Sequence, residues 1–161
     1  MHVIELQELF KSYGSVQALK GLSLNVPKGC LYALLGPNGS GKTTTLRILC
    51  TLLAPDSGQV TVAGFDALND PRSVRRELGY VAQEVAIDKI LTGVELLQLQ
   101  GDLYHLQSNE RDVRIAELIE RLDMKDWIDR RCGSYSGGMR RRLDLATGLL
   151  HQPQLLVLDE P

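Results

Sequence analysis

The pattern of apolar and polar residues divides the chain into an α/β half and a largely helical half. Residues 2–10 alternate loosely and residues 22–26 alternate cleanly, which predicts two strands on either side of a turn at residues 12–15. Further along this half we expect a buried strand at residues 31–35, a helix at 44–49 and a strand at 59–64. A short helix at residues 71–78 and a strand at 80–83 follow. An antiparallel β lobe therefore precedes strands that we expect to be parallel and buried.

The second half, from residue 91 to about residue 150, shows helical spacing of its apolar residues and no strand pattern. Gly101 weakens the continuity of its first helix, and Ser108 and Asn109 are candidate N-cap residues for the next one. An apolar strand is expected at residues 155–158. We therefore predict an α/β fold with an inserted α-helical subdomain. Residues 1–83 would form the β lobe together with the core, residues 84–150 the helical insertion and residues 151–161 the last strand.

Residues 36–43, GPNGSGKT, fill every position of the phosphate-loop pattern G-x-x-x-x-G-K-[ST]. They lie between an expected strand and an expected helix, where backbone N–H groups and the helix dipole can surround a polyphosphate. In this pattern Lys42 reaches the β- and γ-phosphate oxygens, Thr43 ligates the bridging Mg²⁺ and Thr44 adds a hydroxyl. A glycine-rich turn without a ligand is the alternative. The candidate phosphate-binding residues are Gly36, Pro37, Asn38, Gly39, Ser40, Gly41, Lys42, Thr43 and Thr44.

Two acidic residues, Asp159 and Glu160, follow the strand expected at residues 155–158. A strand that is buried on both faces would hold Asp159 at its carboxyl end, where open α/β sheets bind their ligands, and this carboxylate can ligate Mg²⁺. Glu160 beside it can act as a general base on an attacking water. A surface turn with two acids is the alternative interpretation.

Composition narrows the function classes. The chain has 161 residues and a formal net charge of −2, which argues against a nucleic-acid partner. The basic cluster at residues 140–142 is interpreted as a solvated helix face, with a phosphate or partner contact as the alternative. Three distant cysteines favour a reduced, cytosolic chain without a metal site. We expect no export signal, because the N-terminus has no basic region followed by an apolar core, and no membrane span, because no apolar run reaches about eighteen residues.

Residues 134–143, SYSGGMRRRL, resemble the signature motif of ATP-binding cassette (ABC) proteins, usually written LSGGQ. The phosphate loop precedes this motif and the acidic strand end follows it, so the resemblance covers the whole chain and implies a P-loop NTPase core with a mainly parallel sheet. The forms YSGGMRRRLDLA and TLLAPDSGQVTVAGFD resemble most closely the ATPase subunits of daunorubicin-resistance and related drug, lipid or polysaccharide exporters.

At the signature motif, Ser136, Gly137 and Gly138 open an expected helix, and the residues alone favour an ordinary serine N-cap. The resemblance implies that they contact the γ-phosphate of ATP held by a second cassette, in a head-to-tail dimer around two ATP molecules. Tyr135 and Met139 stand where the family has Leu and Gln, and the loss of the amide at Met139 puts the hydrogen bond of that glutamine in question.

Two further residues match family positions. Gln83 ends an expected strand before the helical insertion, as the Q-loop glutamine does, and the resemblance implies that it contacts Mg²⁺ or the attacking water. Tyr13 matches the aromatic residue on which cassettes stack adenine, although a core-packing tyrosine is the alternative. Trp127, His105 and His151 show no partner spacing and are interpreted as packing or surface residues.

The resemblance implies a subunit that binds and hydrolyses ATP with Mg²⁺ and energises a separate membrane-spanning permease from the cytoplasmic face of the membrane. Family members continue past the acidic strand end to a further strand and a switch histidine, whereas this sequence stops at Pro161, after the Walker B motif. We therefore expect a truncated cassette of marginal stability. The alternatives are a nucleotide-binding fragment without turnover and a soluble cassette that acts on ribosomes or DNA.

Overall fold

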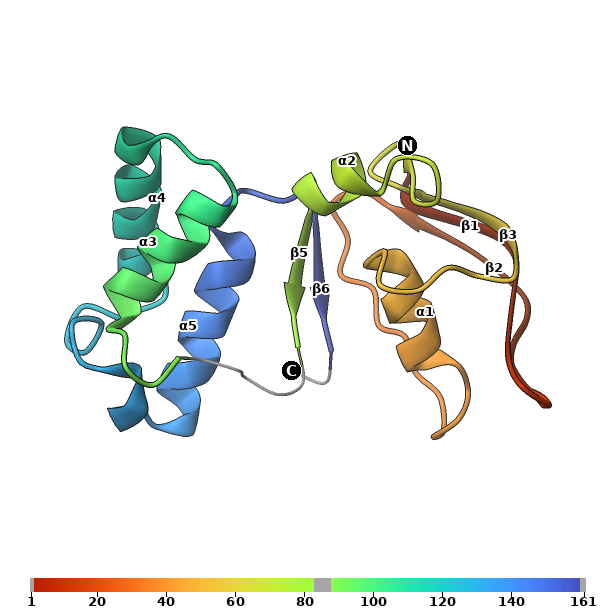
Figure 1. Cartoon of the computed structure of the whole chain (residues 1–161), viewed down its shortest axis with the longest axis horizontal. Coiled ribbons are helices and arrows are strands. Elements are labelled where there is room, and N and C mark those ends of the chain that lie inside the picture. Colours follow the sequence, from red (N-terminus) through yellow and green to blue (C-terminus); the bar gives the residue numbers. More distant parts are fainter. Residues whose placement is uncertain (1, 83–87, 160–161) are drawn as a thin grey trace. The chain divides into compact units, whose positions relative to one another are not determined.

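The computed structural model describes residues 2–82 and 88–159, which form two compact units. The first unit is Met1–Leu78 and the second is Gly79–Pro161. Their elements are labelled in Figure 1. Each unit has its own sheet and its own packed helices, so each is described by itself.

The first unit contains a four-stranded antiparallel sheet with the strand order β2-β1-β3-β4. Strands β1 (His2–Tyr13) and β2 (Val16–Pro27) form a long hairpin, which confirms both predicted strands and confines the turn to residues 14 and 15. Strand β3 (Ser57–Val62) pairs with β1, and the short strand β4 (Phe65–Asp66) pairs with β3 at the edge of the sheet. The β1–β2 hairpin is the antiparallel lobe expected from the sequence, but β3, which was expected among the parallel strands, pairs antiparallel with β1 and belongs to the same sheet.

Helix α1 (Lys42–Leu49) packs against β2 and β3 through Thr45, Ile48 and Leu49, which lie on one face at helical spacing. Helix α2 (Pro71–Arg76) begins with proline after Asp70, whose carboxylate accepts a hydrogen bond from the Ser73 N–H at 3.2 Å. The fully buried residues of this unit are Leu6, Leu9, Thr45, Ile48, Val60, Val62 and Val74.

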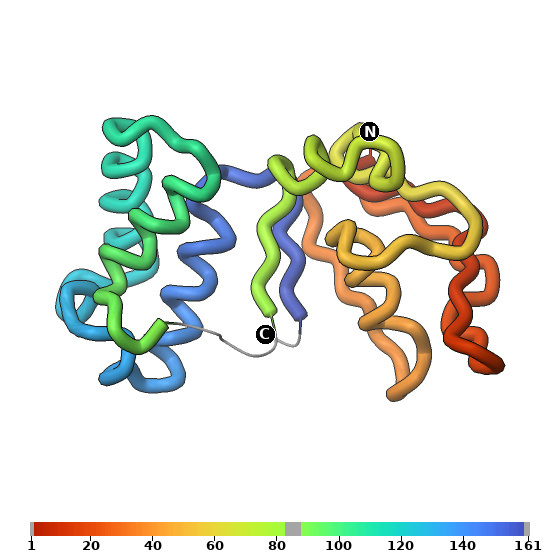
Figure 2. Tube along the Cα trace, in the orientation of Figure 1, coloured from red at the N-terminus to blue at the C-terminus, as the bar shows by residue number. Residues whose placement is uncertain are grey.

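The prediction of a buried strand at residues 31–35 is wrong. This segment has irregular backbone, and its Leu31 and Leu35 side chains are 97% and 87% exposed. Figure 2 shows it as an irregular trace that leads into α1. A strand requires a hydrogen-bonded neighbour, and within residues 2–82 and 88–159 no strand pairs with this segment.

In the second unit, β5 (Leu78–Val81) and β6 (Leu155–Leu158) form a two-stranded sheet in which both strands run in the same direction (Figure 1). Helix α5 (Gly137–Leu149) approaches β5 so closely that a Cβ at Gly79 would overlap the carbonyl oxygen of Gly148. Of the four residues of β6, only Val157 is buried, so the expected burial of this strand on both faces is not seen.

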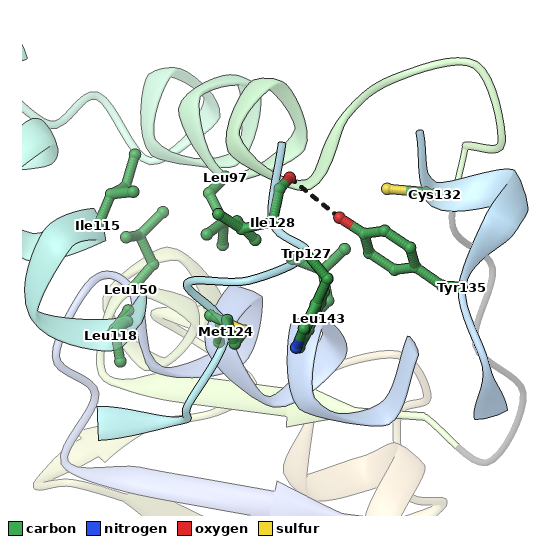
Figure 3. Close-up of a cluster of buried hydrophobic side chains, with 11 residues drawn as sticks. Leu97, Ile115, Leu118, Met124, Trp127, Ile128, Cys132, Tyr135, Leu143 and Leu150 are labelled. Carbon is green, nitrogen blue, oxygen red and sulfur yellow. Dashed lines mark hydrogen bonds between the residues drawn. The ribbon is translucent and has the colours of Figure 1, made fainter. Parts of the chain in front are cut away.

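The helical part of this unit encloses its own hydrophobic core (Figure 3). Helices α3 (Gly93–Leu103), α4 (Ser108–Arg121) and α5 contribute to it, together with the 3-10 helix η1 (Cys132–Ser134) and the segment before it. Helix α3 runs through Gly101, where a Cβ would meet the Arg111 side chain. The N-cap of α4 is Gln107, which makes no side-chain cap, rather than Ser108 or Asn109.

An aromatic pair anchors this core beside the start of α5. The Trp127 and Tyr135 rings meet edge to face with centroids 4.9 Å apart, and the Tyr135 hydroxyl donates to the Ile128 carbonyl at 3.0 Å. Trp127 is therefore a packing residue, as predicted. In the described part of the chain, no helix combines the length and apolar character that crossing a membrane would require.

Candidate nucleotide-binding site

The predicted phosphate loop curves into the first turn of α1 through glycines in the left-handed region. Gly39 has φ +81° and Gly41, the residue before the helix, has φ +92°. A Cβ at Gly41 would lie 2.7 Å from both the Ala18 carbonyl oxygen and Leu19 Cδ2, so the loop passes directly against β2. Glycine is required at Gly41 for both its backbone angle and its space.

Lys42 lies over this loop. Its Nζ donates to the carbonyl oxygens of Gly36 at 2.7 Å and Pro37 at 3.0 Å. The Ser40 N–H also donates to the Pro37 carbonyl at 3.2 Å, which tightens the curve. Because both acceptors of the ammonium group are neutral, its positive charge is available to an anion, and phosphate oxygens are the stronger acceptors.

The start of α1 is open to a ligand. No side chain caps the helix at Gly41, so the amide groups of its first turn are directed at the loop without an internal side-chain acceptor. An open pocket of about 470 Å³ lies beside it, between β2 and the loop. It is lined by residues 17–22, 34, 35, 39–42 and 45. This volume is in the range of small-molecule sites.

The three threonines that follow Lys42 have different environments. Thr43 is exposed and Thr44 is half-buried, so both hydroxyls are near the surface of the predicted phosphate site. Thr45 is buried, and its hydroxyl donates to the Gly41 carbonyl at 2.9 Å, which ties the helix to the loop. The role of Thr45 was not predicted from the sequence, although its helical spacing with Ile48 and Leu49 could have indicated its burial.

Tyr13 is the last residue of β1, at the tip of the hairpin, and its side chain is 46% exposed. It is therefore a surface aromatic and not a core-packing tyrosine. Val16, which begins β2, is exposed as well.

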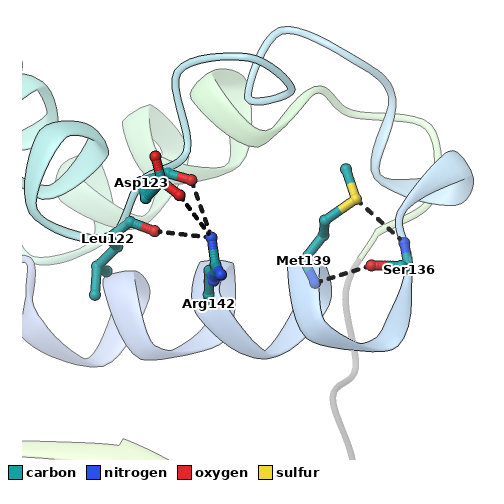
Figure 4. A network of polar contacts seen from close by, with 5 residues as sticks. All are labelled: Leu122, Asp123, Ser136, Met139 and Arg142. Carbon is teal, nitrogen blue, oxygen red and sulfur yellow. Dashed lines mark hydrogen bonds and ion pairs between the residues drawn. The ribbon is translucent and has the colours of Figure 1, made fainter.

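The signature motif also begins a helix, but here a side chain caps it. Ser136 Oγ accepts from the Met139 N–H at 3.2 Å, and the Ser136 N–H donates to Met139 Sδ at 3.5 Å (Figure 4). The thioether thus takes the acceptor role that the family's glutamine would have, as a weaker acceptor. Gly137 and Gly138 are exposed, and a Cβ at either would meet nothing within 4 Å.

The interpretation of residues 140–142 as a solvated helix face agrees with the exposure of Arg140 and Arg142, whereas Arg141 is half-buried, and all three side chains also make hydrogen bonds. Arg140 Nη1 donates to the Tyr135 carbonyl at 2.8 Å, and Arg141 Nη1 donates to the Ala82 carbonyl at 2.8 Å. Arg142 Nη1 contacts the Asp123 carbonyl at 3.1 Å and its carboxylate at 3.4 Å (Figure 4). All three arginines therefore hold the signature helix to other segments of its own unit.

The acidic strand end is positioned by β5. The Asp159 N–H donates to the Val81 carbonyl at 3.0 Å, and Asp159 Oδ2 accepts from the Tyr80 hydroxyl at 3.2 Å. Tyr80 was not recognised from the sequence, since nothing local marks a residue that contacts a carboxylate 79 positions away.

The remaining predicted residues are distributed over the two units. Lys42 and Thr43 belong to the first unit and Asp159 to the second, and each is described within its own unit. Gln83 and Glu160 lie outside the described residues. The His151 ring stacks on Tyr104 with centroids 3.8 Å apart, which agrees with its interpretation as a packing residue.

Comparison with known proteins identifies the family. The family model described as "ABC transporter" matches residues 19–161, and the chain belongs to that family. It is 46% identical over 160 residues to the daunorubicin resistance ATP-binding protein DrrA2 of Streptomyces coeruleorubidus, covering 99% of this chain and 50% of that protein. It is also 46% identical over 153 residues to the doxorubicin resistance ATP-binding protein DrrA of Mycobacterium tuberculosis, covering 94% of this chain and 46% of that protein.

Solved structures agree on the fold. An ATP-binding subunit of an ABC transporter superposes with a TM-score of 0.86 at 25% identity, over 97% of this chain and 65% of the other. CbiO1 from Clostridium perfringens, described as part of the ABC transporter complex cbiONQ, superposes with a TM-score of 0.90 at 25% identity, over 99% and 66%. The chain thus has the P-loop fold of ABC ATPase domains, as predicted, and spans about half the length of the relatives described above.

Proposed function

We propose that this chain is the ATP-binding portion of an ATP-hydrolysing subunit that energises a separate membrane-spanning permease of an exporter for drugs, lipids or polysaccharides. The observation that carries the proposal is the start of α1, where an uncapped helix, the ammonium group of Lys42 and a pocket of about 470 Å³ meet. Membership of the ABC transporter family supports ATP as the nucleotide. Its drug-resistance relatives support an export function.

In this proposal the phosphates of ATP are bound by Lys42 Nζ and by the backbone amides of residues 39–43. Lys42 exchanges the carbonyls of Gly36 and Pro37 for charged oxygens, which are better acceptors. The Thr43 hydroxyl and the Asp159 carboxylate are hard oxygen ligands of the kind that Mg²⁺ prefers. When bound, Mg²⁺ neutralises the charge that develops on the phosphates.

Turnover is assigned to two residues next to described strands. Glu160 would take a proton from the attacking water, and Gln83 would orient that water or contact the metal. The residue before Glu160 is held by Tyr80, and the residue before Gln83 is held by Arg141, through the contacts given above. These two contacts support a fixed starting point for each functional segment.

The proposal also includes a second cassette. Ser136, Gly137 and Gly138 would meet ATP bound to the phosphate loop of that partner, in a head-to-tail dimer at the cytoplasmic face of the membrane. The free space around both glycines supports this, because the backbone of the motif can be approached closely from outside.

The test combines a titration of Mg-ATP with an assay of phosphate release. We expect the chain to bind ATP, and Lys42→Met to weaken binding by about 100-fold, since a charge-assisted contact to phosphate is lost. Lys125→Met is the matched control, because Lys125 forms an exposed ion pair with Glu120 in the helical unit. It should leave binding unchanged.

Glu160→Gln separates binding from catalysis. The variant should bind ATP as tightly as the parent chain and lose phosphate release, if the carboxylate acts as the base. Binding by the parent without phosphate release would identify a nucleotide-binding fragment without turnover. If the parent chain does not bind ATP at all, the proposed function is wrong.

A further inference from the structure

The end of β1 that bears Tyr13 is held by a residue from another loop. The pairing of β1 with β3 ends at Phe10 and Ser57, so within residues 2–82 and 88–159 the neighbouring strand of residues 11–13 is β2 alone. The register of that remaining pairing shifts between Lys11 and Ser12. A two-stranded ribbon of this kind is marginally stable by itself.

Asp56, immediately before β3, continues the support beyond the end of the third strand. Its N–H donates to the Phe10 carbonyl at 2.9 Å. Its Oδ1 accepts from Lys11 Nζ at 2.8 Å and its Oδ2 accepts from the Ser12 N–H at 2.7 Å. Three successive residues before Tyr13 are thus held by one aspartate.

The two side-chain contacts differ in character. The Lys11 side chain is mostly buried, with 15% exposed, so its ammonium group is held in a defined position against Asp56. The Ser12 contact is to backbone, which fixes the chain direction one residue before Tyr13. The hydrogen bond from Lys11, and then that from the Ser12 N–H, lower the pKa of the Asp56 carboxyl, so it remains charged at neutral pH.

We propose that Asp56 is a positioning residue for nucleotide binding, which holds the hairpin tip so that the Tyr13 ring is available for stacking on the adenine base. This inference rests on the proposed ATP-binding function. Asp56 touches no nucleotide atom in this scheme, and it acts through Tyr13. Its loss should therefore affect ligands that contain the base and spare ligands that consist of phosphates alone.

The experiment compares the affinities of the chain for Mg-ATP and for inorganic tripolyphosphate with Mg²⁺. Tyr13→Ala should weaken ATP binding by about tenfold, the loss expected for one stacked base, and leave tripolyphosphate binding unchanged. Asp56→Asn should weaken ATP binding by about threefold to fivefold, again without an effect on tripolyphosphate. Lys11→Met removes one of the two side-chain contacts and should have a smaller effect of the same kind.

A double variant separates positioning from a general loss of structure. If Asp56 acts through the ring, Asp56→Asn should cause no further loss of ATP affinity in a Tyr13→Ala background. Asp66→Asn is the matched control, because Asp66 is also an exposed aspartate of this unit that accepts loop N–H groups, from Leu68 at 2.8 Å and Asn69 at 3.0 Å. It should leave both affinities unchanged.

The outcomes are distinct. A selective loss of ATP affinity that disappears in the Tyr13→Ala background supports the inference. An equal loss for ATP and tripolyphosphate, an additive double variant, or no loss in Asp56→Asn overturns it while the proposed function stands. If the parent chain binds tripolyphosphate and ATP equally poorly, the proposed function fails and the positioning role fails with it.

Discussion

Two helices of this protein begin at glycine-rich turns, and they differ in what accepts the hydrogen bonds of their first amide groups. Helix α1 follows Gly41, which is in the left-handed region and offers no side-chain cap. Helix α5 follows Ser136, whose hydroxyl oxygen accepts the Met139 N–H. Similar sequences of glycine and hydroxyl residues thus produce one helix start without a side-chain cap, here called the open start, and one that is capped by its own serine, here called the closed start.

The glycines differ in the same way. Gly41 cannot carry a side chain because β2 lies against it, whereas Gly137 and Gly138 have free space around them. At the phosphate loop, Gly41 allows the backbone to turn sharply against β2. At the signature motif the glycines leave room for another molecule, which agrees with the proposed role in a partner's site.

The largest expected effect tests this difference directly. Gly41→Ala should destabilise the first unit by about 3 kcal/mol, because alanine is strained at φ +92° and its Cβ would overlap Ala18 and Leu19. Gly138→Ala should change stability by no more than about 1 kcal/mol, in the stabilising direction. Urea unfolding followed by circular dichroism measures both, and equal effects would refute the contrast.

A smaller effect is expected from the hydroxyl residues at the two starts. Ser136→Ala removes the cap of α5 and should lower the free energy of unfolding by about 1 kcal/mol. Thr43→Ala, at the open start, should change it by less than about 0.5 kcal/mol, because Thr43 is exposed. Thermal unfolding of the two variants should separate them, and a comparable loss in Thr43→Ala would show that α1 is capped after all.

Tyr135, which directly precedes the closed start, adds a pH dependence. Burial raises its pKa to about 12, so the fold favours the neutral phenol. The unfolded chain ionises first, near pH 10, and stability should fall as the pH rises from about 10 toward 12. Tyr135→Phe should remove this part of the fall and cost about 1 kcal/mol at pH 8 through the lost bond to Ile128. Urea unfolding at pH 8 and 11 compares the two proteins; an identical fall in both would contradict the assignment.

The smallest expected effect concerns the second hydrogen bond of the α5 cap, from the Ser136 N–H to Met139. Met139→Gln replaces a thioether by an amide oxygen, a better acceptor for the Ser136 N–H, and should stabilise the second unit by about 0.5 kcal/mol. Met139→Leu is the control, since it keeps the apolar contact and offers no acceptor. A melting temperature that rises equally in both variants would show that packing is responsible.

Sequence patterns correctly predicted the elements whose structure depends on residues that are close in sequence. The helix after the phosphate-loop motif, the signature helix and most strands were predicted correctly because their motifs or periodicities are contained in short segments. Residues 31–35 were misjudged because the same apolar run is a strand only where another strand pairs with it. Arg141 was misjudged because its acceptor, the Ala82 carbonyl, is 59 residues away, and Tyr80 was missed for the same reason.

Lys42 Nζ donates hydrogen bonds to the carbonyls of Gly36 and Pro37, so the lysine of the predicted phosphate loop holds the loop's own backbone in place. The conformational entropy that this loop loses on becoming ordered is therefore lost during folding and not during ligand binding. In the proposed function, a bound nucleotide would replace these two carbonyl acceptors of Lys42 with phosphate oxygens. We would accordingly expect association to be fast, and differences in affinity among phosphate-loop variants to arise mainly from the rate of dissociation.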